Sequence, residues 1–272
     1  MKSILELTVI KALNIVEIKY FVIYPFSYDG NIHYNPITLL HNNEGLCIIF
    51  HDMKKDTFDR QVNKFKSIIS NIVADYLELL DSRYLDDREK EYMRLYRNKQ
   101  ADIDDIEDSL LNLSICLEKH YGEKVVILID EYDVPLQHAY IKGYYDEMVE
   151  FIRNVFSAVL KTNTSLQLGV LTGCLRIVKE SIFTGLNNFS VYGITEEISA
   201  QYFGFTPQEV KQALKDYDLL AYEEEVKNWY DGYKFGNQEI YNPWSIINYL
   251  EQASRTSNQQ PVSFWAKVVM IW

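Results

Sequence analysis

The chain has 272 residues, 47% of them hydrophobic, so it can bury a substantial core. Its net charge of −12 argues against a basic nucleic-acid-binding surface, and we expect no direct nucleic-acid partner. No run of about 18 uncharged apolar residues and no signal-peptide core occur, which predicts a cytoplasmic location without a membrane partner. The cysteines Cys47, Cys116 and Cys174 are scattered in apolar surroundings, which is typical of buried thiols in a reducing compartment.

Residues 46–171 contain short apolar runs that alternate with longer stretches in which apolar residues recur at helical spacing. Residues 1–45 show no clear period apart from a strand-like run at 20–24. The order of strands and helices that follows predicts a parallel sheet covered by helices. The predicted strands are 46–50, 125–129 and 166–171, the predicted helices are 62–80, 88–97, 103–117 and 145–159, and a loop is predicted at 135–143.

The character of the chain changes after Asn187, where short helical segments follow one another. Thr206-Pro207 with Glu209 three residues after the threonine predicts a capped helix start. We interpret this part as a mainly helical lid with one hairpin, similar to a winged helix, whose aromatic residues pack its core. The predicted helices are 196–203, 207–217, 221–230 and 243–250, and the hairpin joins 233–235 to 239–241 through Gly236-Asn237.

The most informative segment is the apolar run 125–129, which ends abruptly in Asp130-Glu131. A strand buried on both faces is typical of the centre of a parallel sheet, and its carboxyl end is where open α/β sheets bind ligands. In P-loop NTPases this Walker B arrangement uses the Asp for Mg²⁺ and a following Glu for the attacking water. An ordinary buried strand followed by a solvated turn explains the dipeptide equally well.

The partner motif of such a site is missing from the sequence. A Walker A loop reads G-x-x-x-x-G-K-[ST], and its amides and lysine hold the phosphates. The chain has eleven glycines, and none is followed by lysine. Upstream of the predicted central strand only Gly30, Gly45 and Gly122 occur, so no relaxed version of the loop exists either.

Several longer motifs resemble one known family. They are Leu128–Leu136 (LIDEYDVPL), Gly169–Asn188 (GVLTGCLRIVKESIFTGLNN), Trp229–Gly236 (WYDGYKFG) and Glu239–Ile246 (EIYNPWSI). In this order they resemble the AAA-ATPase-like proteins of anaerobic bacteria, in which an ATPase domain typically precedes a PD-(D/E)XK-type nuclease domain. The resemblance extends from about Leu46 to about Trp265 and implies ATP and Mg²⁺ as cofactors.

The resemblance also implies roles for individual residues. Asp130 would coordinate Mg²⁺, and Glu131 would be the general base for attack of water on the γ-phosphate. Thr172, at the end of the next strand, lies where a sensor hydroxyl of such ATPases would contact the attacking water or the γ-phosphate. These three residues would form the core of the site.

Two further residues have alternative interpretations. Arg176 is a candidate for stabilising transition-state charge, but it could equally pair with Glu180 four residues later. Asp133 is a candidate cofactor-binding residue in a supporting position, or a loop cap. The sequence does not decide between these alternatives.

Both ends of the chain depart from the family pattern. Family members begin with a strand and a Gly-Lys-Thr loop, which residues 1–45 lack, and residues 267–272 also differ. The nuclease chemistry needs an Asp on one strand and Glu-x-Lys on the next. The strand-like Glu17-Ile18-Lys19 has no preceding Asp, so we expect no nuclease activity. These departures are typical of a disrupted or truncated gene.

We therefore predict an α/β fold with an incomplete P-loop NTPase-type parallel sheet followed by the helical lid. The predicted divisions are an unmatched segment 1–45, a core without Walker A at 46–190, the lid at 191–255 and a divergent tail at 256–272. One hypothesis is an ATPase that binds nucleotide weakly, alone or as a homo-oligomer, or through a partner chain that supplies the phosphate loop. The other is a non-catalytic interaction module or gene remnant, without cofactor.

Overall fold

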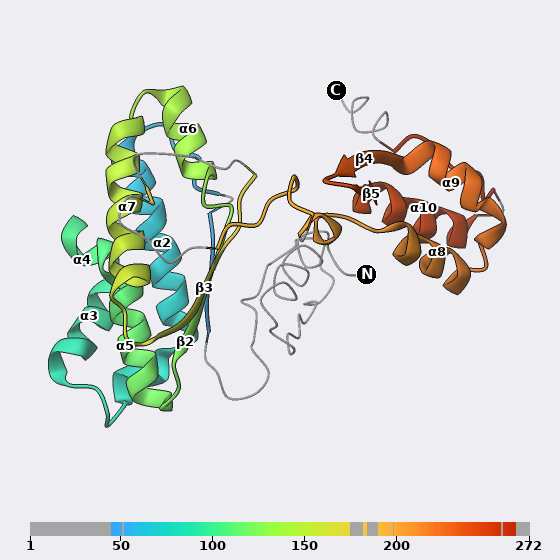
Figure 1. Ribbon diagram of the computed structural model, residues 1–272. Helices are drawn as coiled ribbons and strands as arrows, with labels where there is room; N and C mark the ends of the chain where they lie inside the picture. Colours follow the sequence, from blue (N-terminus) through green and yellow to red (C-terminus); the bar gives the residue numbers. More distant parts are fainter. Residues whose placement is uncertain are drawn as a thin grey trace. The chain divides into compact units, whose positions relative to one another are not determined.

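The computed structural model describes residues 45–50, 52–174, 182–183, 190–197, 199–256 and 258–264 (Figure 1). The predicted strand at 20–24 and the divergent residues 267–272 lie outside these ranges. The chain divides into two units, whose described parts are residues 45–183, called the N-terminal unit, and 190–264, called the C-terminal unit.

A parallel sheet of three strands forms the centre of the N-terminal unit. The strands are β1 (Gly45–Ile49), β2 (Val125–Asp130) and β3 (Leu166–Leu171), and β2 lies between the other two. Ile49 is in register with Asp130, and Ile129 with Leu171, so the three carboxyl ends meet at one edge of the sheet. The predicted mixed α/β character and the three predicted strands are confirmed.

Both faces of β2 are buried. Ile127 and Ile129 belong to the main core of the unit, whereas Val126 and Leu128, which alternate with them along the strand, are also buried. This explains why the run is apolar without alternation.

Helices pack along one face of the sheet, as Figure 1 shows for α2, α5 and α7. Their apolar stripes supply most of the core, including Phe65, Leu113 and Phe156, none of which is exposed. The helices of this unit are α2 (Phe58–Asp75), α3 (Asp87–Arg97), α4 (Ile103–Glu107), α5 (Ser109–Tyr121), α6 (Val134–Lys142) and α7 (Tyr145–Lys161), with a 3₁₀ turn η1 (Leu77–Asp81).

The predicted loop at 135–143 is wrong, because this segment is the helix α6. Pro135 occupies its first turn, and Gly143 ends it with a φ of +84°. Proline at the start and glycine after the end are helix boundary signals, so the same two residues could have predicted the helix. Two other predicted helices are each divided: 103–117 breaks at Asp108 between α4 and α5, and 62–80 continues into η1 after Asp75.

The C-terminal unit contains three helices and a hairpin among the described residues. The capping box of Thr206 and Glu209 is confirmed at the start of α8, whereas the predicted helix 196–203 is only the single turn η2. The elements are η2 (Ala200–Tyr202), α8 (Pro207–Asp216), η3 (Leu220–Tyr222), α9 (Glu223–Tyr230), β4 (Asp231–Phe235), β5 (Gln238–Tyr241) and α10 (Pro243–Arg255).

Two tyrosine side chains form hydrogen bonds that hold residues 258–264, the segment that follows α10. The Tyr230 hydroxyl donates to the Val262 carbonyl (2.8 Å) and accepts from the Val262 N–H (2.9 Å). The Tyr249 hydroxyl donates to the Gln259 carbonyl at 2.8 Å. The ring of Phe264 lies 5.9 Å from that of Tyr230. The segment is therefore held to the core of the C-terminal unit by side chains.

Candidate functional site

Asp130 and Thr172 meet at the carboxyl edge of the sheet. Asp130 is the last residue of the central strand β2, and Thr172 directly follows β3. The backbone continues the ladder there, since Thr172 N–H donates to the Ile129 carbonyl (2.8 Å) and Tyr132 N–H to the Thr172 carbonyl (3.1 Å). The predicted placement of Asp130-Glu131 beside the end of β3 is confirmed.

The two carboxylate oxygens of Asp130 have different surroundings. Oδ1 accepts hydrogen bonds from the Thr172 hydroxyl and from the Glu131 N–H, the latter at 3.0 Å. Oδ2 is buried and has no hydrogen-bond partner among the residues that the structure describes. A buried carboxylate oxygen without a partner is costly, which makes this atom the most unusual polar group of the edge.

Burial is the main cause of a raised pKa at Asp130. The neighbouring carboxylates of Glu131 and Asp133 raise the pKa further, while the hydrogen bonds from Thr172 and the Glu131 N–H lower it. Desolvation therefore outweighs the two hydrogen bonds at Asp130.

Glu131 has a left-handed backbone, with a φ of +55°. A side chain other than glycine, asparagine or aspartate rarely adopts this conformation, which costs about 1–2 kcal/mol. The Glu131 carbonyl accepts from the Val134 N–H (3.0 Å), so the turn leads directly into α6. The tight corner between β2 and α6 therefore fixes the direction in which the Glu131 side chain leaves the sheet.

Asp133 ties the start of α6 to the loop after β3. Its side chain is fully buried; Oδ2 accepts from the Gln137 side chain (2.5 Å), and Oδ1 accepts from the Cys174 N–H (3.3 Å). These contacts join the start of α6 to the loop after β3, and the role of Asp133 as a supporting cofactor-binding residue or a loop cap stays a prediction.

Gly173 is a residue of this edge that the sequence motifs did not single out. A Cβ atom at this position would lie 2.6 Å from Asp133 Oδ1 and 2.8 Å from the Tyr132 ring. The loop after β3 can approach the β2–α6 corner only because this residue has no side chain. Its position directly after the candidate sensor threonine was the available signal.

The other predicted residues of this region have different outcomes. Arg176 lies outside the described residues, so its role stays a prediction. Cys116 is buried as expected, but the prediction for Cys174 is wrong, because this residue is exposed. The physical reason is its place in the loop beyond the edge of the sheet, where β3 has already ended.

The donor set fits a metal held by a single carboxylate. No group of three His, Cys, Asp or Glu side chains within the described ranges is arranged to share an ion. Mg²⁺ in phosphoryl-transfer sites, however, is held by one or two carboxylates, and water and substrate phosphates complete its shell. The unpartnered Oδ2 of Asp130 matches that mode of binding.

Comparison with known proteins decides the family. The sequence profile of the predicted AAA-ATPase family, described as AAA-ATPase-like, matches residues 35–183, more than half of the chain. The chain belongs to this family. The match begins before the predicted core boundary at residue 46 and includes β1, β2, β3 and the Asp130–Thr172 pair.

A curated relative of this AAA-ATPase-like chain is an uncharacterized protein in the vnfD 5′ region of Azotobacter chroococcum mcd 1. It is 29% identical over 127 residues, which are 46% of this chain and 24% of that protein. The chain thus spans about a quarter of that relative's length. No solved structure matches the present chain. In the parts that the structure describes, no helix is long and apolar enough to cross a bilayer.

Proposed function

We propose that this AAA-ATPase-like chain supplies the residues that hold the metal ion and activate the attacking water in a P-loop NTPase-type site. We also propose that it does not hydrolyse ATP alone. The observation that carries the proposal is the buried, unpartnered Oδ2 of Asp130 beside the Thr172 hydroxyl. Membership of the family supports a nucleotide as the ligand class.

In this proposal each residue of the edge has one task. Asp130 would hold Mg²⁺ through Oδ2, while Thr172 fixes the rotamer of the carboxylate through Oδ1. Glu131 would orient and deprotonate a water molecule, as the general base of such sites does. When bound, the metal ion would neutralise charge on the phosphate oxygens.

The sequence explains why turnover is not expected from this chain alone. No glycine precedes a lysine, so the usual amide cradle and its lysine are missing. Loss of a single donor to a developing anion costs about 3–4 kcal/mol in other enzymes, and here several donors are missing. A partner chain that carries a phosphate loop would complete the site.

The test is a titration of a fluorescent ATP analogue in the presence of Mg²⁺, together with an assay of phosphate release. We expect no saturable binding at low micromolar concentration and no release above that of Glu131→Gln. Mg²⁺ alone should raise the thermal midpoint of the natural chain but not that of Asp130→Asn. Low-micromolar ATP binding, or an equal effect of Mg²⁺ on both proteins, would contradict the proposal.

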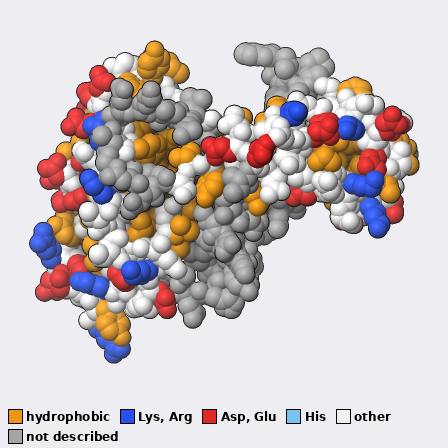
Figure 2. Space-filling view, viewed as in Figure 1, with side chains coloured by type: hydrophobic (Ala, Val, Ile, Leu, Met, Phe, Trp, Pro, Cys, Tyr) orange, Lys and Arg blue, Asp and Glu red, His pale blue; other side chains and the backbone are white. Residues whose placement is uncertain are grey.

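A non-catalytic interaction module is the second candidate, and exposed aromatic residues of the C-terminal unit favour it. The sequence predicted that these residues pack the lid, but Trp229 is 54%, Tyr233 47% and Trp244 40% exposed. Figure 2 shows hydrophobic side chains at the surface among charged ones in this unit. A module of this kind should bind its partner equally well with Asp130→Asn and lose binding with Trp229→Ala.

A further inference from the structure

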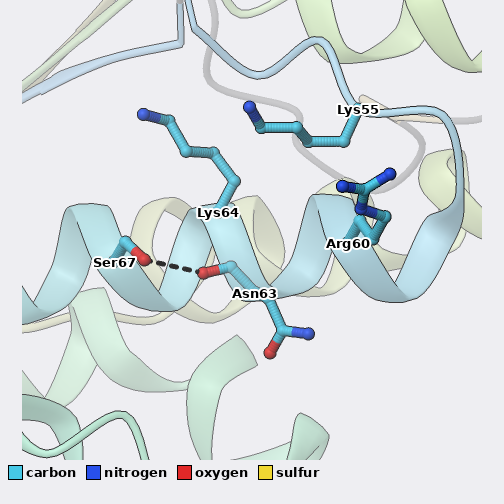
Figure 3. A pocket seen from close by; sticks show the side chains of 5 residues that line it. All are labelled: Lys55, Arg60, Asn63, Lys64 and Ser67. Carbon is cyan, nitrogen blue, oxygen red and sulfur yellow. Dashed lines mark hydrogen bonds between the residues drawn. The ribbon is translucent and has the colours of Figure 1, made fainter.

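Three cationic side chains line one pocket formed by the start of α2 and the loop before it. The pocket has a volume of about 360 Å³, and its lining consists of Lys55, Arg60, Asn63, Lys64 and Ser67. In Figure 3, Lys55, Arg60 and Lys64 extend on the same side of α2, and the amide of Asn63 points away from them. A chain with a net charge of −12 thus concentrates positive charge at this pocket.

The nearby carboxylates compensate this charge only in part. Asp56 is paired with Lys142 on α6, at 2.8 Å. Asp52 reaches only to 3.6 Å from Lys64, and its side chain is 74% exposed. Within the described residues, Lys55 and Arg60 have no carboxylate oxygen within 4.0 Å. An incoming anion would therefore meet two cations without ion-pair partners and a third that is weakly paired.

The backbone below the pocket is fixed in place. Gln61, which is fully buried on α2, accepts from the Lys55 N–H (2.8 Å) and donates to the Met53 carbonyl (2.5 Å). The Tyr144 hydroxyl donates to the Lys55 carbonyl. The loop that carries Lys55 is thus held against the helix that carries Arg60 and Lys64, so the three cations line the pocket without rearrangement of the backbone.

We propose that this pocket binds the phosphate groups of a small phosphorylated ligand. Arginine presents a fork of N–H donors that matches phosphate oxygens, and the two lysines add point charges. The Ser67 hydroxyl donates to the Asn63 carbonyl, so its oxygen is left as an acceptor and the cations carry the binding. Binding here needs no metal and does not depend on the proposed role of Asp130.

The test is calorimetric titration of the full chain with inorganic phosphate and with pyrophosphate, in the presence of a chelator. We expect saturable binding of both, tighter for pyrophosphate because it offers more charge to the three cations. Arg60→Ala with Lys64→Ala should weaken pyrophosphate binding at least about tenfold, as expected when charge-assisted hydrogen bonds are lost. Arg60→Lys should retain part of the affinity.

The matched control is Lys90→Ala with Arg94→Ala, which removes the same charge at the same four-residue spacing from α3. This pair should leave the affinity unchanged, and Asp130→Asn should also leave it unchanged. Absence of saturation, or equal losses in both double variants, would overturn the proposal. Tighter binding of a short single-stranded oligonucleotide than of pyrophosphate would also overturn it, because the ligand would then be a nucleic-acid backbone.

Discussion

Asp130 uses its two oxygens differently, and the difference has a measurable cost. Oδ1 is satisfied by Thr172 and by the Glu131 N–H, whereas Oδ2 is buried without a partner in the described part of the chain. Because burial raises the pKa of Asp130, the folded protein binds a proton at this group more tightly than the unfolded chain does. The ionised carboxylate therefore lowers stability at neutral pH.

Asp130→Asn should accordingly stabilise the protein at neutral pH, by about 1 kcal/mol, since a neutral buried group is less costly than a charged one. The advantage should shrink as the pH falls through the raised pKa and disappear below the ordinary value of 3.8, where both states are protonated. Urea unfolding at neutral and mildly acidic pH measures this difference. An advantage that grows on acidification would contradict the prediction.

The hydroxyl of Thr172 contributes in the opposite direction, because its hydrogen bond lowers the pKa of Asp130. Thr172→Val should destabilise the protein by about 1–2 kcal/mol, since Oδ1 then keeps only the Glu131 N–H. Thr172→Ser retains the hydroxyl and serves as the control. Chemical denaturation of the three proteins provides the comparison, and a loss in Thr172→Ser without one in Thr172→Val would indicate that the methyl group matters instead.

For single residues, the sequence predicted which side chains meet at the edge of the sheet. It did not predict the backbone conformations that bring them together. Asp130 and Thr172 were both expected at strand ends, and parallel strands bring such ends together. The left-handed Glu131 and the steric need for Gly173 depend on contacts between segments about 40 residues apart. No local pattern reports such contacts, so these two features required the structure.

Two glycines of the N-terminal unit are needed for different physical reasons. Gly143 ends α6 at a φ of +84°, and a Cβ atom added there would meet no described atom within 4 Å. Gly173 has no positive φ, but a Cβ atom there would collide with Asp133 and Tyr132. One glycine thus provides a backbone conformation and the other provides space.

Alanine at each position should separate these causes. Gly143→Ala should cost about 1 kcal/mol from backbone strain alone and leave the Asp130 edge unchanged. Gly173→Ala should cost about 1–3 kcal/mol through overpacking and also remove the stabilisation by Mg²⁺. Thermal melts with and without Mg²⁺ test both variants. If Gly143→Ala abolished the effect of Mg²⁺ as well, the assignment of causes would be wrong.

Elements with strong local signals were predicted well, and those that depend on tertiary packing were not. The hairpin β4–β5 and the capped start of α8 follow from Gly236 and from Thr206 with Glu209. The break at Asp108 was missed because apolar spacing continues across it from α4 to α5. Helical spacing cannot distinguish one helix from two that share a buried stripe.

At the scale of the whole molecule, the described residues form two separate hydrophobic cores, one in each unit. Each unit also has a helix that begins with a capping box: Asp86 with Glu89 on α3, and Thr206 with Glu209 on α8. Separate cores favour separate cooperative transitions. The sequence indicated this division through the change of character after Asn187.

Alanine at the two caps should therefore affect different transitions. Asp86→Ala should lower the stability of the N-terminal unit, and Thr206→Ala that of the C-terminal unit, each by about 1 kcal/mol. Calorimetry should resolve two transitions, of which each variant shifts one. A common shift of a single transition in both variants would show that the units unfold together.

The hydrogen bonds that hold residues 258–264 make the usually harmless substitution Tyr230→Phe informative. Because the Tyr230 hydroxyl bonds to both the N–H and the carbonyl of Val262, it takes the place of a neighbouring strand's peptide group. Phenylalanine at position 230 would fill the same space in the core, but the Val262 N–H and carbonyl, 32 residues along the chain, would lose this hydrogen-bond partner. Tyr230→Phe should therefore make this stretch more accessible to proteases, as limited proteolysis would measure, although Tyr249 still holds Gln259.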